Sequence, residues 1–469
     1  MKYYPTIGLE IHSELLTESK IFCGCSAAFG GEPNSRCCPV CSGLPGTLPV
    51  LNRQAVEFII RAGFATGCEI SRFTKWDRKN YFYPDLPKAY QISQMPRPVC
   101  LSGALEVNGG KYRINRIHLE EDAGKLVHAA GDTLADYNRC GIPLMELVTE
   151  PDFHTTEEVK AFVERLRLIY MYIGVCDGKM EQGSLRCDVN ISIAPEGCSE
   201  LGTRAEIKNL NSTRSITRAI EYEIIRQTEL LESGGRVVQE TRRFDDNSGE
   251  TLSMRSKEDA HDYRYFPDPD IPPVLFTEDE LSAIEATLPE LPRERLARYM
   301  GDYKLSPVDA ENIVNNPLLA FYFDAAVSAY PTNPKGIGSA LLTDFTRRVT
   351  DFENLPITAP DFAELIQWVD EGKIARLNYK DVLREIFDDG ASKDFRIIAE
   401  QNGYIIKQDN ALVEKTISEV LSANPTALTQ YRSGDNKVFG FLMGQCSAKL
   451  KGVATPQIIK PELERQLQG

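Results

Sequence analysis

Residues 184–193 read SLRCDVNISI, and within this stretch polar and apolar side chains alternate without a break. The apolar set is Leu185, Cys187, Val189, Ile191 and Ile193, and the polar set is Ser184, Arg186, Asp188, Asn190 and Ser192. A period of two is typical of a β-strand that buries one face. The stretch therefore predicts a strand whose polar face carries Asp188.

Four other segments repeat this alternation, and each also places acidic groups on its polar face. The polar positions include Glu10 and His12 in residues 7–12, His118 and Glu120 in 114–122, Glu146 in 143–152, and Glu206 and Lys208 in 203–209. An antiparallel sheet with one solvated face is the commonest cause of such alternation. Here short Glu, Asp, His and Asn side chains mix with Arg and Lys, which favours polar faces that converge on a site.

Converging carboxylates with an imidazole suit Mg²⁺ or Mn²⁺, and neighbouring basic groups suit phosphates. This is the outline of a phosphoryl-transfer site. The sequence has no G-x-x-x-x-G-K-[ST] loop, no G-x-S-x-G elbow and no protein-kinase signature set. If ATP is used, the fold is therefore not a P-loop fold. Because no Gly-Ser-Ser run of the amidase type occurs either, we expect that the chain does not release ammonia itself.

Five of the twelve cysteines lie within residues 22–41, FCGCSAAFGGEPNSRCCPVC. A C-x-C pair and a C-x-x-C pair bracket a loop, and four thiolates in this arrangement suit tetrahedral zinc. The predicted ligands are Cys23, Cys25, Cys38 and Cys41, with Cys37 as an alternative to Cys38. A redox-active C-x-x-C should open a helix, whereas glycines and a proline follow here. Four cysteine ligands leave no open position for substrate, so the zinc is expected to be structural.

The chain has 469 residues, which suggests about three domains that need no disulfide for stability. An apolar leader is absent and no apolar run reaches membrane-span length, so we expect a cytoplasmic protein in which structural disulfides are rare. The formal net charge is −15, but residues 411–469 hold seven basic and five acidic side chains. This tail is the surface least repulsive to nucleic acid, although a solvated helical bundle would explain it too.

Helical patterns dominate after residue 275. A Thr277-x-x-Glu280 capping box opens one helix, and Ser306 with Pro307 opens another. An earlier helix begins at a Thr155-x-x-Glu158 box and carries an apolar stripe that is expected to be core. The sequence thus predicts an α+β chain with a helical domain over about residues 276–405.

Six segments together carry a family resemblance: GLEIHSEL, PVCSGLPGTLPVLN, DRKNYFYPDLPKAYQISQ, HLEEDAGK, EIKNLNS and YRYFPDPDIPP. They resemble the B subunit of the aspartyl-tRNA(Asn)/glutamyl-tRNA(Gln) amidotransferase, the GatB family. The resemblance implies a mixed or antiparallel-sheet cradle over 1–275, the helical domain over 276–405, and a YqeY-like helical tail over 406–469 that contacts tRNA.

The family resemblance also implies an activity and partners. With ATP, a GatB chain phosphorylates the side-chain carboxylate of a misacylated Glu or Asp on tRNA. Ammonia from a separate glutaminase chain, the A subunit, then displaces phosphate. A small C subunit holds the other two chains together. Which of Glu-tRNA(Gln) and Asp-tRNA(Asn) is the substrate stays open.

Roles for individual residues follow from the same resemblance. The implied catalytic residues are Glu10, His12, Glu120, Glu146, Asp188 and Glu206, of which Glu10, His12, Glu120 and Glu146 would hold Mg²⁺. Glu121 and Asp122 are rivals of Glu120. The candidates for ATP phosphates are Lys79, Lys88, Arg186 and Lys208, although surface ion pairing would explain each of them as well. Two other functions stay open: a zinc-pinned scaffold that presents tRNA, and a metal-dependent nuclease.

Overall fold

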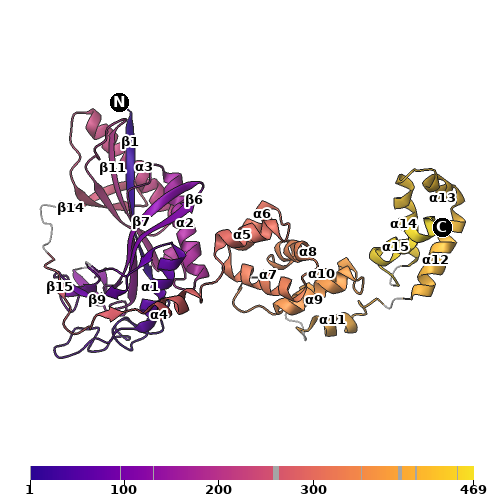
Figure 1. Cartoon of the computed structure of the whole chain (residues 1–469), viewed down its shortest axis with the longest axis horizontal. Coiled ribbons are helices and arrows are strands. Elements are labelled where there is room, and N and C mark those ends of the chain that lie inside the picture. The colour runs from indigo at the N-terminus through magenta and orange to yellow at the C-terminus, as the bar shows by residue number, and fades with distance from the viewer. Residues whose placement is uncertain are drawn as a thin grey trace. The chain divides into compact units, whose positions relative to one another are not determined.

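The computed structural model describes residues 2–95, 97–129, 131–256, 263–349, 351–388, 393–406, 409–450 and 453–468. The chain divides into two compact units, Met1–Pro292 and Arg293–Gly469 (Figure 1). A large sheet with helices makes up the first unit, and the regular elements described in the second are helices. This composition confirms the predicted α+β class.

Nine strands build the main sheet. They are β1 (Tyr3–Glu14), β2 (Glu69–Ile70), β6 (Cys100–Val107), β7 (Gly110–Glu121), β10 (Pro143–Thr149), β11 (Leu185–Pro195), β12 (Ala205–Leu210), β13 (Glu240–Asp245) and β14 (Glu250–Ser256). Their order is β14-β13-β12-β11-β1-β10-β7-β6-β2. Neighbours are antiparallel except β12 and β13, which are parallel. The strand β1 therefore lies in the middle of a mixed sheet.

One face of the sheet is packed against three helices, α1 (Arg53–Ala65), α2 (Thr156–Tyr172) and α3 (Thr213–Glu232). The apolar residues of β1 that face them, Ile7, Leu9 and Ile11, are at most 1% exposed. Val189 and Ile191 of β11 pair across from them and are fully buried. Because strand side chains alternate, the polar residues between them face the other side of the sheet. The predicted strands and their facing are confirmed.

A small three-stranded sheet lies beside this polar face. It consists of β15 (Phe266–Pro267), β4 (Asp77–Asn80) and β5 (Tyr90–Ser93), in that order. β5 contacts β7 of the main sheet. Two two-stranded sheets complete the strands: β3 (Phe73–Thr74) pairs with the distant β16 (Val274–Leu275), and β8 (Lys125–Ala129) with β9 (Asp132–Asp136). The small sheet and the segment before β15 bring Lys79, Tyr263 and Tyr265 to the side of the main sheet that carries the acids.

The predicted helix starts are confirmed. Thr155 and Thr277 form capping boxes at the starts of α2 and α4 (Glu278–Glu285), and Ser306 caps α6 (Pro307–Val314) with proline in its first turn. α4 packs against α1 in the first unit. The second unit contains α5 (Pro292–Gly301), α6, α7 (Pro317–Ala329), α8 (Pro334–Ala340), α9 (Ala359–Asp370), α10 (Arg376–Phe387) and α11 (Phe395–Gln401).

Four helices follow with an apolar core of their own. They are α12 (Asn410–Ala423), α13 (Pro425–Arg432), α14 (Lys437–Lys449) and α15 (Pro456–Gln468). The three predicted domain ranges, 1–275, 276–405 and 406–469, stay predictions. A membrane-spanning helix, which needs a longer and more apolar run, does not occur among the residues described here.

Candidate functional site

The polar face of the main sheet forms the floor of a cleft of about 720 Å³. Five strands supply its ionisable side chains, in the order β12, β11, β1, β10 and β7. These side chains are Glu206 and Lys208, Arg186 and Asp188, Glu10 and His12, Glu146, and Arg116, His118 and Glu120, with Arg204 and Asp122 directly beside β12 and β7. From the small sheet and the segment before it, Lys79, Tyr263 and Tyr265 line the opposite wall. The polar faces of five separate strands therefore converge on one cleft.

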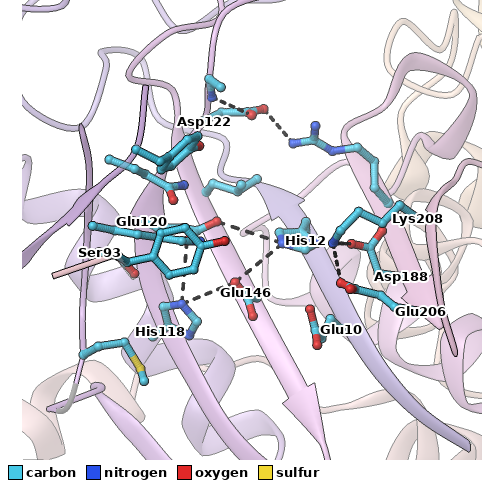
Figure 2. Close-up of a pocket in the computed structure, with 18 of the residues that line it drawn as sticks. Glu10, His12, Ser93, His118, Glu120, Asp122, Glu146, Asp188, Glu206 and Lys208 are labelled. Atoms are coloured by element: carbon cyan, nitrogen blue, oxygen red, sulfur yellow. Dashed lines mark hydrogen bonds and ion pairs between the residues drawn. The ribbon is translucent and has the colours of Figure 1, made fainter. Parts of the chain in front are cut away.

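Strand register places two histidines on either side of Glu146. His12 of β1 and His118 of β7 are both direct partners of Glu146 on β10. The Nε2 atoms of His12 and His118 lie 3.5 and 3.4 Å from Oε2 of Glu146 (Figure 2). Glu120 lies two residues beyond His118 on the same strand face, with oxygens 4.0 Å from His12 and 3.8 Å from His118. Ligand atoms of His12, Glu120 and Glu146 all lie within 4.8 Å of one another.

A second acidic group lies on the other side of β1. Glu10 pairs with Asp188 across β1 and β11, and Glu206 follows on β12. Carboxylate oxygens of these three residues also lie within 4.8 Å of one another. The Lys208 ammonium lies 2.7 Å from Asp188 and 2.6 Å from Glu206 (Figure 2). The expected Mg²⁺ ligands thus divide, since Glu10 belongs to this group and His12, Glu120 and Glu146 to the other.

Burial and crowding of charge shift the pKa values in the cleft. Burial and the charge of Glu146 raise the pKa of Glu10. Although burial alone would lower it, the hydrogen bond and charge of Glu146 raise the pKa of His12 to about 9. The pKa of Glu146 is lowered, since the charges of His118 and His12 outweigh its burial. Bound protons and the Lys208 ammonium therefore neutralise part of the negative charge of the carboxylates in the cleft. A bound cation would have the same effect.

The donor chemistry of both groups suits a hard divalent cation. Carboxylate oxygens are the ligands that Mg²⁺ prefers, and an added imidazole is also compatible with Mn²⁺. Each group brings three such donors within 4.8 Å, on strands that are hydrogen-bonded on both sides. The cleft therefore holds two candidate cation sites, separated by β1.

Comparison with known proteins decides the family. Residues 5–282 match the family model of the GatB/GatE catalytic domain, and residues 321–467 match that of a GatB domain. A relative from Ruminiclostridium cellulolyticum, named as the B subunit of aspartyl/glutamyl-tRNA(Asn/Gln) amidotransferase, is 52% identical over 100% of this chain and 98% of its own. Relatives with the same name from Caldicellulosiruptor saccharolyticus and Trichlorobacter lovleyi are 48% and 46% identical, over the full length of both chains. The chain belongs to the GatB family.

The four basic residues expected to bind phosphates have different surroundings in this GatB chain. Lys208 is held by two carboxylates, and Arg186 lies 2.6 Å from Asp122. Both line the cleft, as does Lys79. Lys79 forms no ion pair with any residue in the described ranges, and its ammonium lies 5.0 Å from the Tyr263 ring. Of the four expected phosphate-binding residues, Lys79 is therefore the one in the cleft that is not held by a carboxylate.

Lys88 lies outside this cleft. Its ammonium is 2.6 Å from Glu121, whose other oxygen accepts the backbone N–H of Ile92 at 2.9 Å. Glu121 points to the opposite side of β7 from Glu120, because adjacent strand positions alternate. Of the two rivals of Glu120, Asp122 does line the cleft, where it holds Arg186. Neither rival joins the group around Glu146.

The GatB cysteine loop brings four thiols together before α1. Sulfur atoms of Cys23, Cys25, Cys38 and Cys41 all lie within 4.8 Å of one another, as the spacing predicts. The Cys41 sulfur accepts the backbone N–H of Cys38 at 3.2 Å, which holds the two ends of the C-x-x-C pair together. The alternative, Cys37, turns instead toward Asn138, with 3.9 Å between Sγ and Oδ1. Four thiols in this arrangement fit the donor set of a structural zinc ion.

Sequence reasoning placed His118 beside Glu120 but gave it no part in the site. The register shows it against Glu146, and its buried Nδ1 atom has no hydrogen-bond partner among the described residues. Its position two residues before Glu120 was the signal that could have assigned it, since both share one strand face. Tyr81, Tyr263 and Tyr265 were also missed, because aromatic residues in a loop carry no periodic signal.

Proposed function

We propose that the cleft activates the side-chain carboxylate of Glu or Asp esterified to tRNA and then converts it to the amide. A carboxylate oxygen attacks the γ-phosphorus of ATP and ADP leaves. Ammonia then attacks the acyl carbon, phosphate leaves with the C–O bonding pair, and the nitrogen loses a proton. A carboxylate does not otherwise react with ammonia at neutral pH, so phosphorylation creates the leaving group.

One observation carries this proposal. Two acidic groups share a cleft with Lys79, which has no ion pair among the described residues, in a chain that belongs to the GatB family over its full length. Mg²⁺ held by His12, Glu120 and Glu146, with Glu10, Asp188 and Glu206 as a second group, would neutralise phosphate charge. Lys79 would contact the phosphates directly, since its ammonium lies 5.0 Å from the Tyr263 ring and forms no ion pair with a described carboxylate. Asp122 would orient Arg186 toward the same ligand.

Partners and a structural metal follow from the same proposal. Ammonia would come from a glutaminase, the A subunit, held to this chain by a small C subunit, and the α12–α15 tail would contact tRNA. We place the reaction in the cytoplasm, because aminoacyl-tRNA is made and used there. Zinc bound by Cys23, Cys25, Cys38 and Cys41 would fix the loop between β1 and α1, with no open ligand position for chemistry.

The test is a reconstituted complex supplied with misacylated tRNA, ATP labelled in the γ-phosphate, and ammonium as nitrogen donor. We expect phosphate release and amide formation that both require tRNA carrying Glu or Asp. Parallel reactions with Glu-tRNA(Gln) and Asp-tRNA(Asn) show which is the substrate. Cleavage of the tRNA chain without ATP use would instead identify a nuclease. If variants in which the acidic side chains of the cleft are neutralised keep full activity, this chain would instead act as a scaffold that presents tRNA.

A further inference from the structure

Lys20 is a fully buried lysine at the entrance of the cysteine loop. Its ammonium donates to the backbone carbonyl of Tyr137 at 3.2 Å, and it lies 3.6 Å from the sulfur of Cys41. The backbone N–H of the next residue, Ile21, donates to the carbonyl of Gly141 at 2.9 Å. Lys20 therefore lies between the thiol group and the segment 137–141.

A buried ammonium needs a negative partner, because transfer of an unpaired charge out of water is very costly. Lys20 forms no ion pair with a carboxylate within the described ranges. The group that contacts the Lys20 ammonium and can serve as its negative partner is the Cys41 sulfur, which carries a negative charge when it ligates a metal. Arg36, the other basic residue between 20 and 46, points away toward the carbonyl of Phe29, at 3.3 Å.

We propose that Lys20 is the counter-charge of the zinc tetrathiolate site, an inference that rests on the proposed zinc site. Zn²⁺ with four thiolates carries a net charge of −2, and a contacting ammonium reduces it to −1. Because the ammonium lies 3.6 Å from the Cys41 sulfur, its attraction to the negatively charged site strengthens zinc binding. Its second bond, to Tyr137, anchors the loaded site to the rest of the first unit.

The experiment compares zinc affinity of the full-length protein and its Lys20→Met variant, by competition with a chromophoric chelator. Methionine keeps the length and apolar stem of lysine but removes the charge. We expect zinc binding to weaken by about 10- to 100-fold, the usual effect of losing a group that supports metal ligands. Lys79→Met is the matched control: it removes another lysine ammonium, one that faces Tyr263 and not a thiol, and should leave zinc affinity unchanged.

A second variant separates charge from hydrogen bonding and guards against misfolding. Lys20→Gln keeps an N–H donor without the charge, so it should also weaken zinc binding. Wild-type affinity in Lys20→Met, or restored affinity in Lys20→Gln alone, would overturn the counter-charge role. If the wild-type protein itself binds no zinc, the zinc site proposed above fails. If the wild type and both variants bind zinc with equal affinity, the role of Lys20 is refuted but the zinc site is not.

Discussion

His118 on β7 and Glu146 on β10 are direct cross-strand partners, and 3.4 Å separates Nε2 of the imidazole from Oε2 of the carboxylate. His12 approaches the same oxygen from β1 at 3.5 Å. One carboxylate thus joins three strands at the centre of the sheet. Removing its charge should affect both imidazoles at once.

The first prediction concerns this carboxylate. Glu146→Gln changes the charge with little change of shape and should weaken Mg²⁺ binding. Phosphoryl transfer should fall on the order of 10²-fold or more, because electrostatic stabilisation is the largest catalytic contribution in such reactions. The measurement follows ATP cleavage and amide formation with ammonium supplied, alongside glutamine hydrolysis by the glutaminase partner.

Glutaminase activity should not share this full loss, since it resides on another chain of the complex. Glu57→Gln, on the outer side of α1 where Glu57 pairs with Arg53 at 2.8 Å, is the matched control and should keep full activity. A defect cured by ammonium would point to ammonia delivery. Normal amidation by Glu146→Gln would refute the site.

The second prediction concerns pH and the metal-free protein. The pKa of His12 in the fold is about 9, above its ordinary value of 6.5, so its charged pair with Glu146 stabilises the fold fully below pH 6.5. That stabilisation is lost as the pH rises through about 9. With chelator present, the wild type should therefore lose more unfolding free energy between pH 6.5 and 9 than His12→Gln. Denaturant unfolding at a series of pH values measures this difference.

His128→Gln serves as the control for the pH series. His128 lies exposed on β8, where its ring contacts the Thr133 hydroxyl at 3.0 Å. Its replacement should leave the pH dependence of the wild type intact. Parallel profiles for wild type and His12→Gln would show that His12 and Glu146 do not form a charged pair.

The third prediction separates the basic residues of the cleft. Lys79→Met should lower ATP turnover on the order of 10²-fold, because an ammonium not already held by a carboxylate can contact a developing phosphate charge. Lys111 is exposed at the start of β7, and the control variant Lys111→Met should leave ATP turnover unchanged. Steady-state ATP hydrolysis by the complex is the readout, and equal rates in both variants would remove Lys79 from the phosphate site.

The fourth prediction tests the thiol group. Cys41→Ser should remove about one equivalent of bound zinc and lower stability by several kcal/mol. Cys37→Ser should keep the zinc, because its sulfur faces Asn138. Metal analysis of the purified proteins distinguishes the two variants. Full zinc content in Cys41→Ser would exclude this set of ligands.

The fifth prediction concerns the tail. Deleting residues 411–469 should weaken tRNA binding and leave the zinc content and the cleft intact, because α12–α15 have a separate core. The lost salt dependence should be shallow, since the tail carries only two more basic than acidic residues. Filter binding of tRNA at several salt concentrations tests this. Unchanged affinity would assign tRNA contact to another surface.

Much of the first unit could be predicted from local sequence. Alternation identified the strands that carry Glu10, Asp188 and Glu206, together with the face each presents, because strand periodicity is a local property. The cysteine spacing likewise anticipated four converging thiols. Both features depend on residues that are close in the chain.

The register between strands that are distant in the chain could not be predicted from the sequence. Glu10 and His12 are neighbours on one face of β1, yet Glu10 groups with β11 and β12, whereas His12 groups with β10 and β7. Lys88 appeared equivalent to Lys79 in sequence, but a 2.6 Å contact with Glu121 holds it outside the cleft. Such pairings depend on which strands become neighbours, and this is settled by the packing of the whole sheet.

The central place of β1 has a consequence for synthesis on the ribosome. Among the described strands, the partners of β1, the first strand to be translated, are β10, which begins at Pro143, and β11, which begins at Leu185. Until β10 emerges both edges of β1 lack a partner strand, and one edge lacks it until β11 emerges; of the three covering helices, α2 and α3 also follow β10 in the chain. Contacts of such long sequence separation form slowly. One edge of β1 therefore stays unpaired through more than a third of elongation, and during this time the nascent chain exposes a strand edge that favours aggregation.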